Sequence, residues 1–199
     1  MISGLVGPRG DGYKVDGAMS AQEAEDYHSF QIGIFRETEA DMVSAFTINY
    51  VDEAIGIVRA AKAAQMPVVI SFTLETDGRL PSGQSLKDAI EQCDWETAKA
   101  AAYYMINCAH PTHFQAELIK SGAWTKRLRG LRANSSKRSH AELDVAPDLD
   151  IGNPVELGRD YRRLRALLPQ LTILGGCCGT DHGHVEQICA ACVEAEAAA

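Results

Sequence analysis

Residues 171–180 read Leu-Thr-Ile-Leu-Gly-Gly-Cys-Cys-Gly-Thr, an apolar run followed by two adjacent cysteines set between glycines. The run Leu171–Leu174 is typical of a buried strand, and the glycines after it indicate a turn. Glycines let a backbone approach a bound group closely, and adjacent thiols are ligands for a soft metal ion. The stretch therefore predicts a strand that ends at a turn suited to a metal-binding or catalytic site.

The same unit, an apolar run followed by a loop and an amphipathic stretch, recurs along the chain. Further strands are expected at Ile2–Val6, Asp41–Ile48, Pro67–Leu74, Tyr104–Cys108 and Arg127–Ala133. Helices are expected at Ser20–Thr38, Val51–Gln65, Ser85–Ala102, Phe114–Gly122 and Thr180–Ala197, and in a segment that Asn153-Pro154 opens. Asn134 to Asp150 is expected to be a long polar loop. Continuous apolar strands joined by helices pair in parallel with both faces covered, which predicts an α/β fold.

The composition is that of a globular protein. Of the 199 residues, 46% are apolar and 23% are charged, which argues against disorder. The length predicts a single domain over residues 1–199, and we find no linker that would divide it. It lies at the low end for a complete (β/α)8 barrel, which typically has about 250 residues.

The charge balance and the hydropathy exclude several classes of partner. The chain has 19 Lys and Arg residues against 27 Asp and Glu residues. The resulting net charge of −8 argues against nucleic acid or an anionic membrane as a binding partner. No apolar run approaches the roughly 18 residues of a membrane span, and no secretory signal is recognised. We therefore expect a cytoplasmic protein, in which clustered cysteines bind metal or catalyse more often than they form disulfides.

Three of the six cysteines are expected to meet in space. Cys108 ends one predicted strand, and Cys177 and Cys178 follow another. In a parallel α/β protein such strand ends converge on one face. Three thiolates can hold Zn2+ and leave a fourth position open, where a substrate thiol would bind and ionise. The alternatives are buried cysteines without a metal and a strained disulfide between Cys177 and Cys178, which a reducing compartment disfavours.

We expect the remaining cysteines and the histidines to have structural roles rather than to bind the metal. Cys93 is expected to be structural, and Cys189 and Cys192 are expected to pack within a helix because no second pair of cysteines accompanies them. His110 and His113 are assigned to the loop around the metal rather than to the ligand set, and Asp181, His182 and His184 to the cap of the last helix. No Walker loop, GxGxxG motif or GxSxG elbow occurs, so neither nucleotide binding nor a serine hydrolase is supported.

Two separated motifs together resemble the homocysteine S-methyltransferase family. They are Asn107-Cys108 at one strand end and Gly175-Gly176-Cys177-Cys178-Gly179-Thr180 at another. The loop Gly7-Pro8-Arg9-Gly10-Asp11 and the stretch Ser82-Gly83-Gln84-Ser85-Leu86 also look familial. The resemblance therefore extends over essentially the whole chain.

The resemblance implies a (β/α)8 barrel and a zinc-dependent reaction. By resemblance, Cys108, Cys177 and Cys178 are the zinc ligands, and Asn107 and Asn134 lie beside the metal and the substrate. The family transfers a methyl group from S-methylmethionine, betaine or a folate to the thiol of zinc-bound homocysteine, which gives methionine. Orientation and metal activation supply the catalysis, and no catalytic group beyond the zinc site is expected.

The chain departs from the family at two places. The family barrel begins two βα units before Ile2–Val6, and neither their Gly-rich motif nor their Thr-Asn-Thr type motif occurs here. About six βα units are therefore expected, in an N-terminally truncated barrel that could form homo-oligomers. Phe46 stands where the family has a glutamate that pairs with the substrate amine, although it could offer a cation–π contact to a donor. The alternatives are thus an inactive barrel that binds zinc or a partner, and a methyltransferase for another thiol or a selenol.

Overall fold

The computed structural model describes residues 1–120 and 122–197, and the side chains as far as residue 193. Six parallel strands alternate with helices, which confirms the predicted α/β class. The chain divides into two compact units, Met1–Thr73 with Leu80–Met105 and Leu74–Arg79 with Ile106–Ala199. The expectation of a single domain over residues 1–199 stays a prediction.

The first unit holds the earlier strands and the helices that connect them. Its strands, in the order β1-β2-β3-β4, are β1 (Ser3–Val6), β2 (Met42–Ile48), β3 (Val68–Thr73) and the start of β4 (Tyr103–Asn107); its helices are α1 (Ala21–Arg36), α2 (Val51–Ala63) and α3 (Leu86–Thr97). Strand β2 pairs in parallel with β1 on one side and with β3 on the other, and Val43 and Val68 are partners in that register. Every residue of β3 is buried, as expected of a parallel strand covered on both faces.

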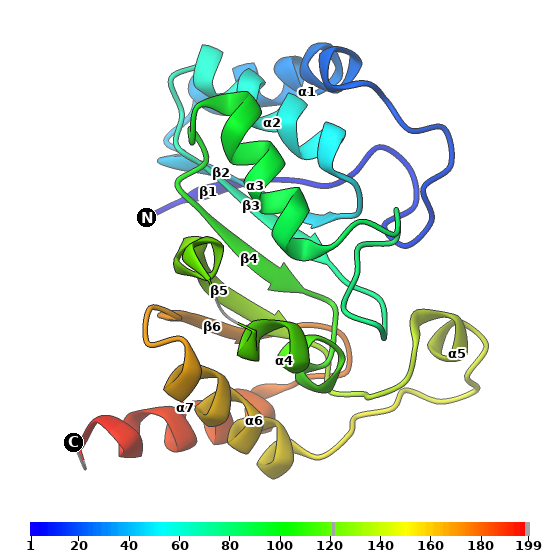
Figure 1. Cartoon of the computed structure of the whole chain (residues 1–199), viewed down its shortest axis with the longest axis vertical. Coiled ribbons are helices and arrows are strands. Elements are labelled where there is room, and N and C mark those ends of the chain that lie inside the picture. The colour runs from blue at the N-terminus through cyan, green and yellow to red at the C-terminus, as the bar shows by residue number, and fades with distance from the viewer. Residues whose placement is uncertain (121, 198–199) are drawn as a thin grey trace. The chain divides into compact units, whose positions relative to one another are not determined.

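The helices of the first unit begin close to where the sequence predicts them. Ser20 caps α1, and the reciprocal contact with Glu23 completes a capping box. Ser85 caps α3, but this helix ends at Thr97 rather than Ala102, because Ala98 adopts a left-handed conformation that stops the helical hydrogen bonds. Helices α1 and α2 pack against each other (Figure 1).

The second unit holds the end of β4 and the remaining elements. They are α4 (Pro111–Ile119), the 3-10 helix η1 (Ala123–Arg127), β5 (Leu128–Ala133), α5 (His140–Asp144), α6 (Pro154–Leu167), β6 (Ile173–Gly176) and α7 (His182–Ala197). Strands β5 and β6 pair in parallel, and Ala133 is the partner of Gly176. Helices α6 and α7 lie against each other in the same unit (Figure 1).

Several elements of the second unit differ from the sequence-based expectation. Helix α4 begins at Pro111 instead of Phe114, because His110 supplies the N-cap and proline suits the first helical position. Helix α5 and the 3-10 helix are not predicted by the sequence pattern, and α5 lies within the segment expected to be a loop. Strand β6 covers 173–176 rather than 171–174, so two glycines belong to the strand. The predicted helix Phe114–Gly122 also spans residue 121, which lies outside the described residues.

Within the described part of the chain, no helix combines the length and the apolar character that crossing a bilayer requires.

Candidate metal centre

Three thiols of the second unit lie together beyond the ends of two strands. Cys108 directly follows β4, and Cys177 and Cys178 directly follow β6. Their three sulfur atoms all lie within 4.8 Å of one another, and the Sγ atoms of Cys108 and Cys177 are 2.6 Å apart. Cys108 has a φ of 54°, a left-handed conformation that is uncommon for a residue other than glycine and that occurs at functional sites. The structure thus brings the three predicted ligands into one group.

The cluster is buried at one end and open at the other. Cys108 is buried, Cys177 is half-buried and Cys178 is exposed. All three thiols are free, so the alternative of a disulfide between Cys177 and Cys178 is not realised. The exposed thiol of Cys178 marks the side from which a small molecule can reach the cluster.

The donor set fits a soft divalent cation. The hydrogen bond with Cys108, followed by that with Cys178 and by burial, raises the pKa of the Cys177 thiol far above its usual range. The pKa of Cys178 is also raised, chiefly by its hydrogen bond with Cys108. A bound cation would offset the repulsion between three thiolates. Tetrahedral zinc, with Zn–S bonds of about 2.3 Å, separates its sulfur ligands by roughly 3.8 Å, so the sulfurs of Cys108 and Cys177, 2.6 Å apart, would have to move apart to bind it.

Asn107, the last residue of β4, contacts the cluster directly. Its Nδ2 donates a hydrogen bond to the Sγ of Cys108 at 3.1 Å, and the side chain is buried. An amide donor to sulfur stabilises the charged thiolate, because a hydrogen bond to the ionised form favours that form. The structure therefore places Asn107 beside the predicted ligand, while a role in substrate binding stays a prediction.

Asn134 connects the two loops that carry the cysteines. Its Nδ2 donates to the carbonyl oxygen of Cys108, and its Oδ1 accepts from the backbone N–H of Cys178, both at 3.1 Å. The side chain is buried and both ends of the amide are used. Asn134 therefore positions the loops, and its predicted contact with substrate stays untested.

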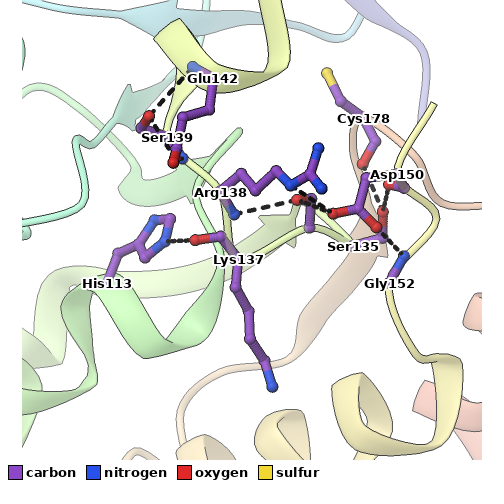
Figure 2. Close-up of polar contacts among 10 residues, drawn as sticks. His113, Ser135, Lys137, Arg138, Ser139, Glu142, Asp150, Gly152 and Cys178 are labelled. Carbon is purple, nitrogen blue, oxygen red and sulfur yellow. Dashed lines mark hydrogen bonds and ion pairs between the residues drawn. The ribbon is translucent and has the colours of Figure 1, made fainter. Parts of the chain in front are cut away.

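Ser135, a residue that sequence reasoning missed, also holds the loop that carries Cys178. Its backbone N–H donates to the carbonyl oxygen of Cys178 at 3.1 Å, and its hydroxyl donates to the carbonyl oxygen of Asp150 at 3.0 Å. Figure 2 shows the thiol of Cys178 pointing away from these hydrogen bonds. A Cβ at Gly179 would collide with the Ser135 side chain and the Asp150 carbonyl, so the turn requires glycine there.

Tyr161 of α6 is inserted between β5 and β6 next to the cluster, and sequence reasoning missed it too. Its hydroxyl accepts from the backbone N–H of Ala133 at 2.8 Å and donates to the carbonyl oxygen of Gly175 at 2.6 Å. With Ala133 and Gly176 as partners, a regular parallel ladder would join that N–H and that carbonyl directly. The hydroxyl thus bridges the two strands near their carboxyl ends. Burial raises the pKa of Tyr161.

The histidines predicted around the metal lie outside the thiol group. His110 caps α4, where its Nδ1 accepts from the backbone N–H of Thr112, and burial lowers its pKa to about 4. His113 contacts the carbonyl oxygen of Lys137 through Nε2 at 2.9 Å. Among the described residues, the only group of three or more metal-ligating side chains is the cysteine cluster.

The cap predicted for the last helix is present. The Oδ1 of Asp181 accepts from the backbone N–H of His184 at 3.2 Å, and the Nδ1 of His184 lies 2.7 Å from the same oxygen. His184 is buried, and its Nε2 contacts the carbonyl oxygen of Ile151 at 2.8 Å. His182 is exposed.

The other cysteines lie in helices. Cys93 of α3 and Cys192 of α7 are buried, as expected of packing residues, whereas Cys189 is exposed. The packing expected of the CxxC pair therefore applies to Cys192 alone.

Phe46, which the family resemblance is expected to align with a glutamate, belongs to the first unit. It is partly buried and packs against the cluster of Met42, Val69 and Met105. Its aromatic ring thus contributes to an apolar core.

The sequence profile of the homocysteine S-methyltransferases matches residues 1–192. The chain belongs to the homocysteine S-methyltransferase family. This membership agrees with the resemblance carried by the Asn-Cys and Gly-Gly-Cys-Cys-Gly-Thr motifs. No curated protein matches the chain closely enough to count as a relative.

Solved structures of a family member show the same fold. The homocysteine methyltransferase MmuM from Escherichia coli matches with a TM-score of 0.64 in its apo form and 0.65 in its metallated form, both at 20% identity. These matches cover 95% and 94% of this chain, but 61% and 60% of MmuM. The chain thus spans about 60% of the length of MmuM and has a partial TIM-barrel fold, as predicted.

Proposed function

We propose that this protein transfers a methyl group from a small donor to the thiol of homocysteine, with Zn2+ as its cofactor. The observation that carries the proposal is the group of three thiols, buried at Cys108 and open at Cys178. Cys108, Cys177 and Cys178 would hold the ion. Bound zinc supplies Lewis-acid chemistry, because it lowers the pKa of a coordinated thiol.

The chain's own residues would position the reaction. The buried side chain of Asn107 donates to Cys108 Sγ, which favours the thiolate form of this ligand. Asn134 and Ser135 hold the Cys178 loop, so the open side of the cluster keeps its geometry. The substrate thiol would approach from the side of Cys178 and release its proton to solvent there. No general base is required.

Family membership supports the substrate classes. We propose homocysteine as the acceptor, S-methylmethionine, betaine or a folate as the donor, and methionine as the product. The cytoplasm, where thiols stay reduced, suits an unpaired cysteine cluster. Small molecules would be the partners, together with other copies of the chain if it forms homo-oligomers.

One observation favours a second candidate, a thiol or selenol acceptor without an ammonium group. Phe46 replaces the family glutamate and packs in an apolar core, so it cannot neutralise an amine. The third candidate is an inactive chain that binds zinc or a partner without turnover.

A methyl-transfer assay separates these candidates. The zinc-reconstituted chain is incubated with S-methylmethionine or betaine and with either homocysteine or 4-mercaptobutyrate, its analogue without the amine. We expect methylation of homocysteine that Cys177→Ser abolishes and that Cys189→Ser, which removes an exposed cysteine outside the cluster, leaves unchanged. Turnover of 4-mercaptobutyrate alone would support the second candidate. No turnover with either acceptor would support the inactive chain.

A further inference from the structure

Arg132 of β5 lies on the face of the second unit's strands that carries the thiols. It is the register partner of Gly175 in β6. The backbone N–H of Cys108 donates to the carbonyl oxygen of Arg132 at 3.1 Å, which in a parallel ladder makes Asn107 its neighbour on the other side. Neighbours across strands direct their side chains to the same face. Asn107 uses that face to reach the Sγ of Cys108, so the Arg132 side chain emerges beside the cluster.

The side chain of Arg132 extends along β6 toward the turn with the two adjacent cysteines. Its Nε donates to the carbonyl oxygen of Gly176 at 3.2 Å. A Cβ at Gly175 would stand 3.7 Å from the Cγ and 3.8 Å from the Nε of Arg132, so the arginine runs alongside this glycine. Cys177 and Cys178 follow directly. The guanidinium is thus held next to two of the three thiols, and the residue is exposed.

The spacing between Arg132 and the cluster suits a small substrate. Cys177 lies two residues beyond Gly175, about 6–7 Å along the strand direction, and β5 runs about 4.8 Å to the side. The carboxylate of homocysteine is separated from its sulfur by three carbon atoms. A thiol at the open position of the cluster would therefore place its far end within reach of the guanidinium. Arginine binds carboxylates with two parallel hydrogen bonds.

The charge of the loaded cluster requires a cation at this place if the substrate is anionic. Three thiolates outweigh the charge of Zn2+, so the cluster with its ion would repel a carboxylate. Two cations that follow β5, Lys137 and Arg138, already pair with Glu156 at 2.8 Å and with Asp150 at 3.7 Å. Arg132, on the face of the thiols, is the cationic side chain whose position allows it to offset this repulsion.

We propose that Arg132 determines the specificity for the acceptor by binding its carboxylate, so that the cluster selects thiols with a carboxylate a few carbons from the sulfur. The contact does not involve the amine, and it is therefore common to homocysteine and 4-mercaptobutyrate. That such a thiol is then methylated rests on the proposed function, whereas its selective binding to the metal-loaded chain does not.

The test compares two thiols that differ only in charge, 4-mercaptobutyrate and its neutral amide. The full chain is reconstituted with Co2+, whose sulfur-to-metal absorption bands report the binding of a further thiol without any methyl transfer. We expect the wild type to bind the carboxylate about tenfold more tightly than the amide. Arg132→Gln keeps an N–H donor for the Gly176 carbonyl but removes the charge and the paired donors, and is expected to bind both thiols about equally.

Arg129→Gln is the matched control, because Arg129 is an exposed arginine of the same strand, three residues before Arg132 and away from the turn. It is expected to keep the preference of the wild type. Equal binding of the two thiols to the wild type, which needs no variant to load metal, would overturn the proposal. So would a preference that Arg132→Gln retains, although methyl transfer to homocysteine would then still support the proposed function. A preference that depends on Arg132 in a chain without methyl transfer would support this site and contradict only the proposed function.

Discussion

The side-chain oxygen of Asn134 accepts a hydrogen bond from the backbone N–H of Cys178 at 3.1 Å, while its Nδ2 donates to the Cys108 carbonyl. One buried amide therefore joins loops that follow different strands and that carry all three clustered thiols. Mutation of residues that orient metal ligands in this way typically lowers metal affinity by about 10- to 100-fold.

Asn134→Asp is expected to weaken zinc binding by about 10- to 100-fold, because a carboxylate cannot donate to the Cys108 carbonyl and would repel it. Competition with a chromophoric chelator measures the affinity. Asn153→Asp makes the same chemical change at the N-cap of α6, where the side chain accepts only from the helix backbone and contacts neither cysteine loop, and its zinc affinity should equal that of the wild type. Equal affinities for all three proteins would show that Asn134 does not position the ligands.

Tyr161→Phe is expected to lower the free energy of unfolding by about 1–3 kcal/mol, because it leaves the Ala133 N–H and the Gly175 carbonyl without their shared hydroxyl. Urea denaturation checks this value. Tyr27→Phe, at an exposed tyrosine, should change stability by less than about 0.5 kcal/mol. Equal stability of the two variants would mean that the Ala133 N–H and the Gly175 carbonyl pair directly in Tyr161→Phe. The inserted hydroxyl would then contribute nothing to the free energy of unfolding.

Gly179→Ala is expected to destabilise the chain more than Gly17→Ala does. Both glycines have a positive φ, 76° and 65°, so alanine strains either backbone by about 1–2 kcal/mol. Gly17 has open space around it, whereas a Cβ at Gly179 would also meet Ser135 and the Asp150 carbonyl. Thermal stability and zinc affinity should both fall further in Gly179→Ala. The same loss in both variants would contradict this account of the turn.

His110 should make stability depend on pH between about 6.5 and 4. Burial lowers its folded-state pKa to about 4 from 6.5, so in this range the unfolded chain binds a proton that the native chain does not. Stability contributed by the neutral ring is therefore present above pH 6.5 and decreases as the pH falls toward 4. His110→Asn keeps a helix-capping side chain but removes this titration.

Urea denaturation of the metal-free chain at about pH 7, 6 and 5 measures this effect. The wild type is expected to lose more stability than His110→Asn as the pH falls through this range. Parallel pH dependences for the two proteins would mean that His110 titrates alike in the native and unfolded chains.

The sequence predicts the parts of the molecule that depend on local pattern. Apolar runs separated by amphipathic stretches identify the six strands and their parallel class. The cysteines at two strand ends are expected to meet, because parallel strands direct their carboxyl ends to one face. The capping box of Ser20 and Glu23 is also visible in the sequence.

Other parts cannot be predicted in this way, for physical reasons. Helix α5 has only five residues and no apolar periodicity, although Ser139 and Glu142 carry the capping-box pattern that could have identified it. The bridging hydroxyl of Tyr161 and the paired hydrogen bonds of Asn134 depend on the register of distant strands, which no local pattern encodes. The apolar spacing of α6 identifies Tyr161 only as a residue of its buried face.

The central claim, three cysteine ligands with a fourth position for the substrate thiol, is tested most directly by zinc K-edge X-ray absorption. Spectra of the zinc-reconstituted chain are recorded with and without saturating homocysteine. We predict three sulfur ligands, those of Cys108, Cys177 and Cys178, in its absence and four in its presence. A sulfur count that homocysteine leaves unchanged, or a chain that retains no zinc, would contradict the account.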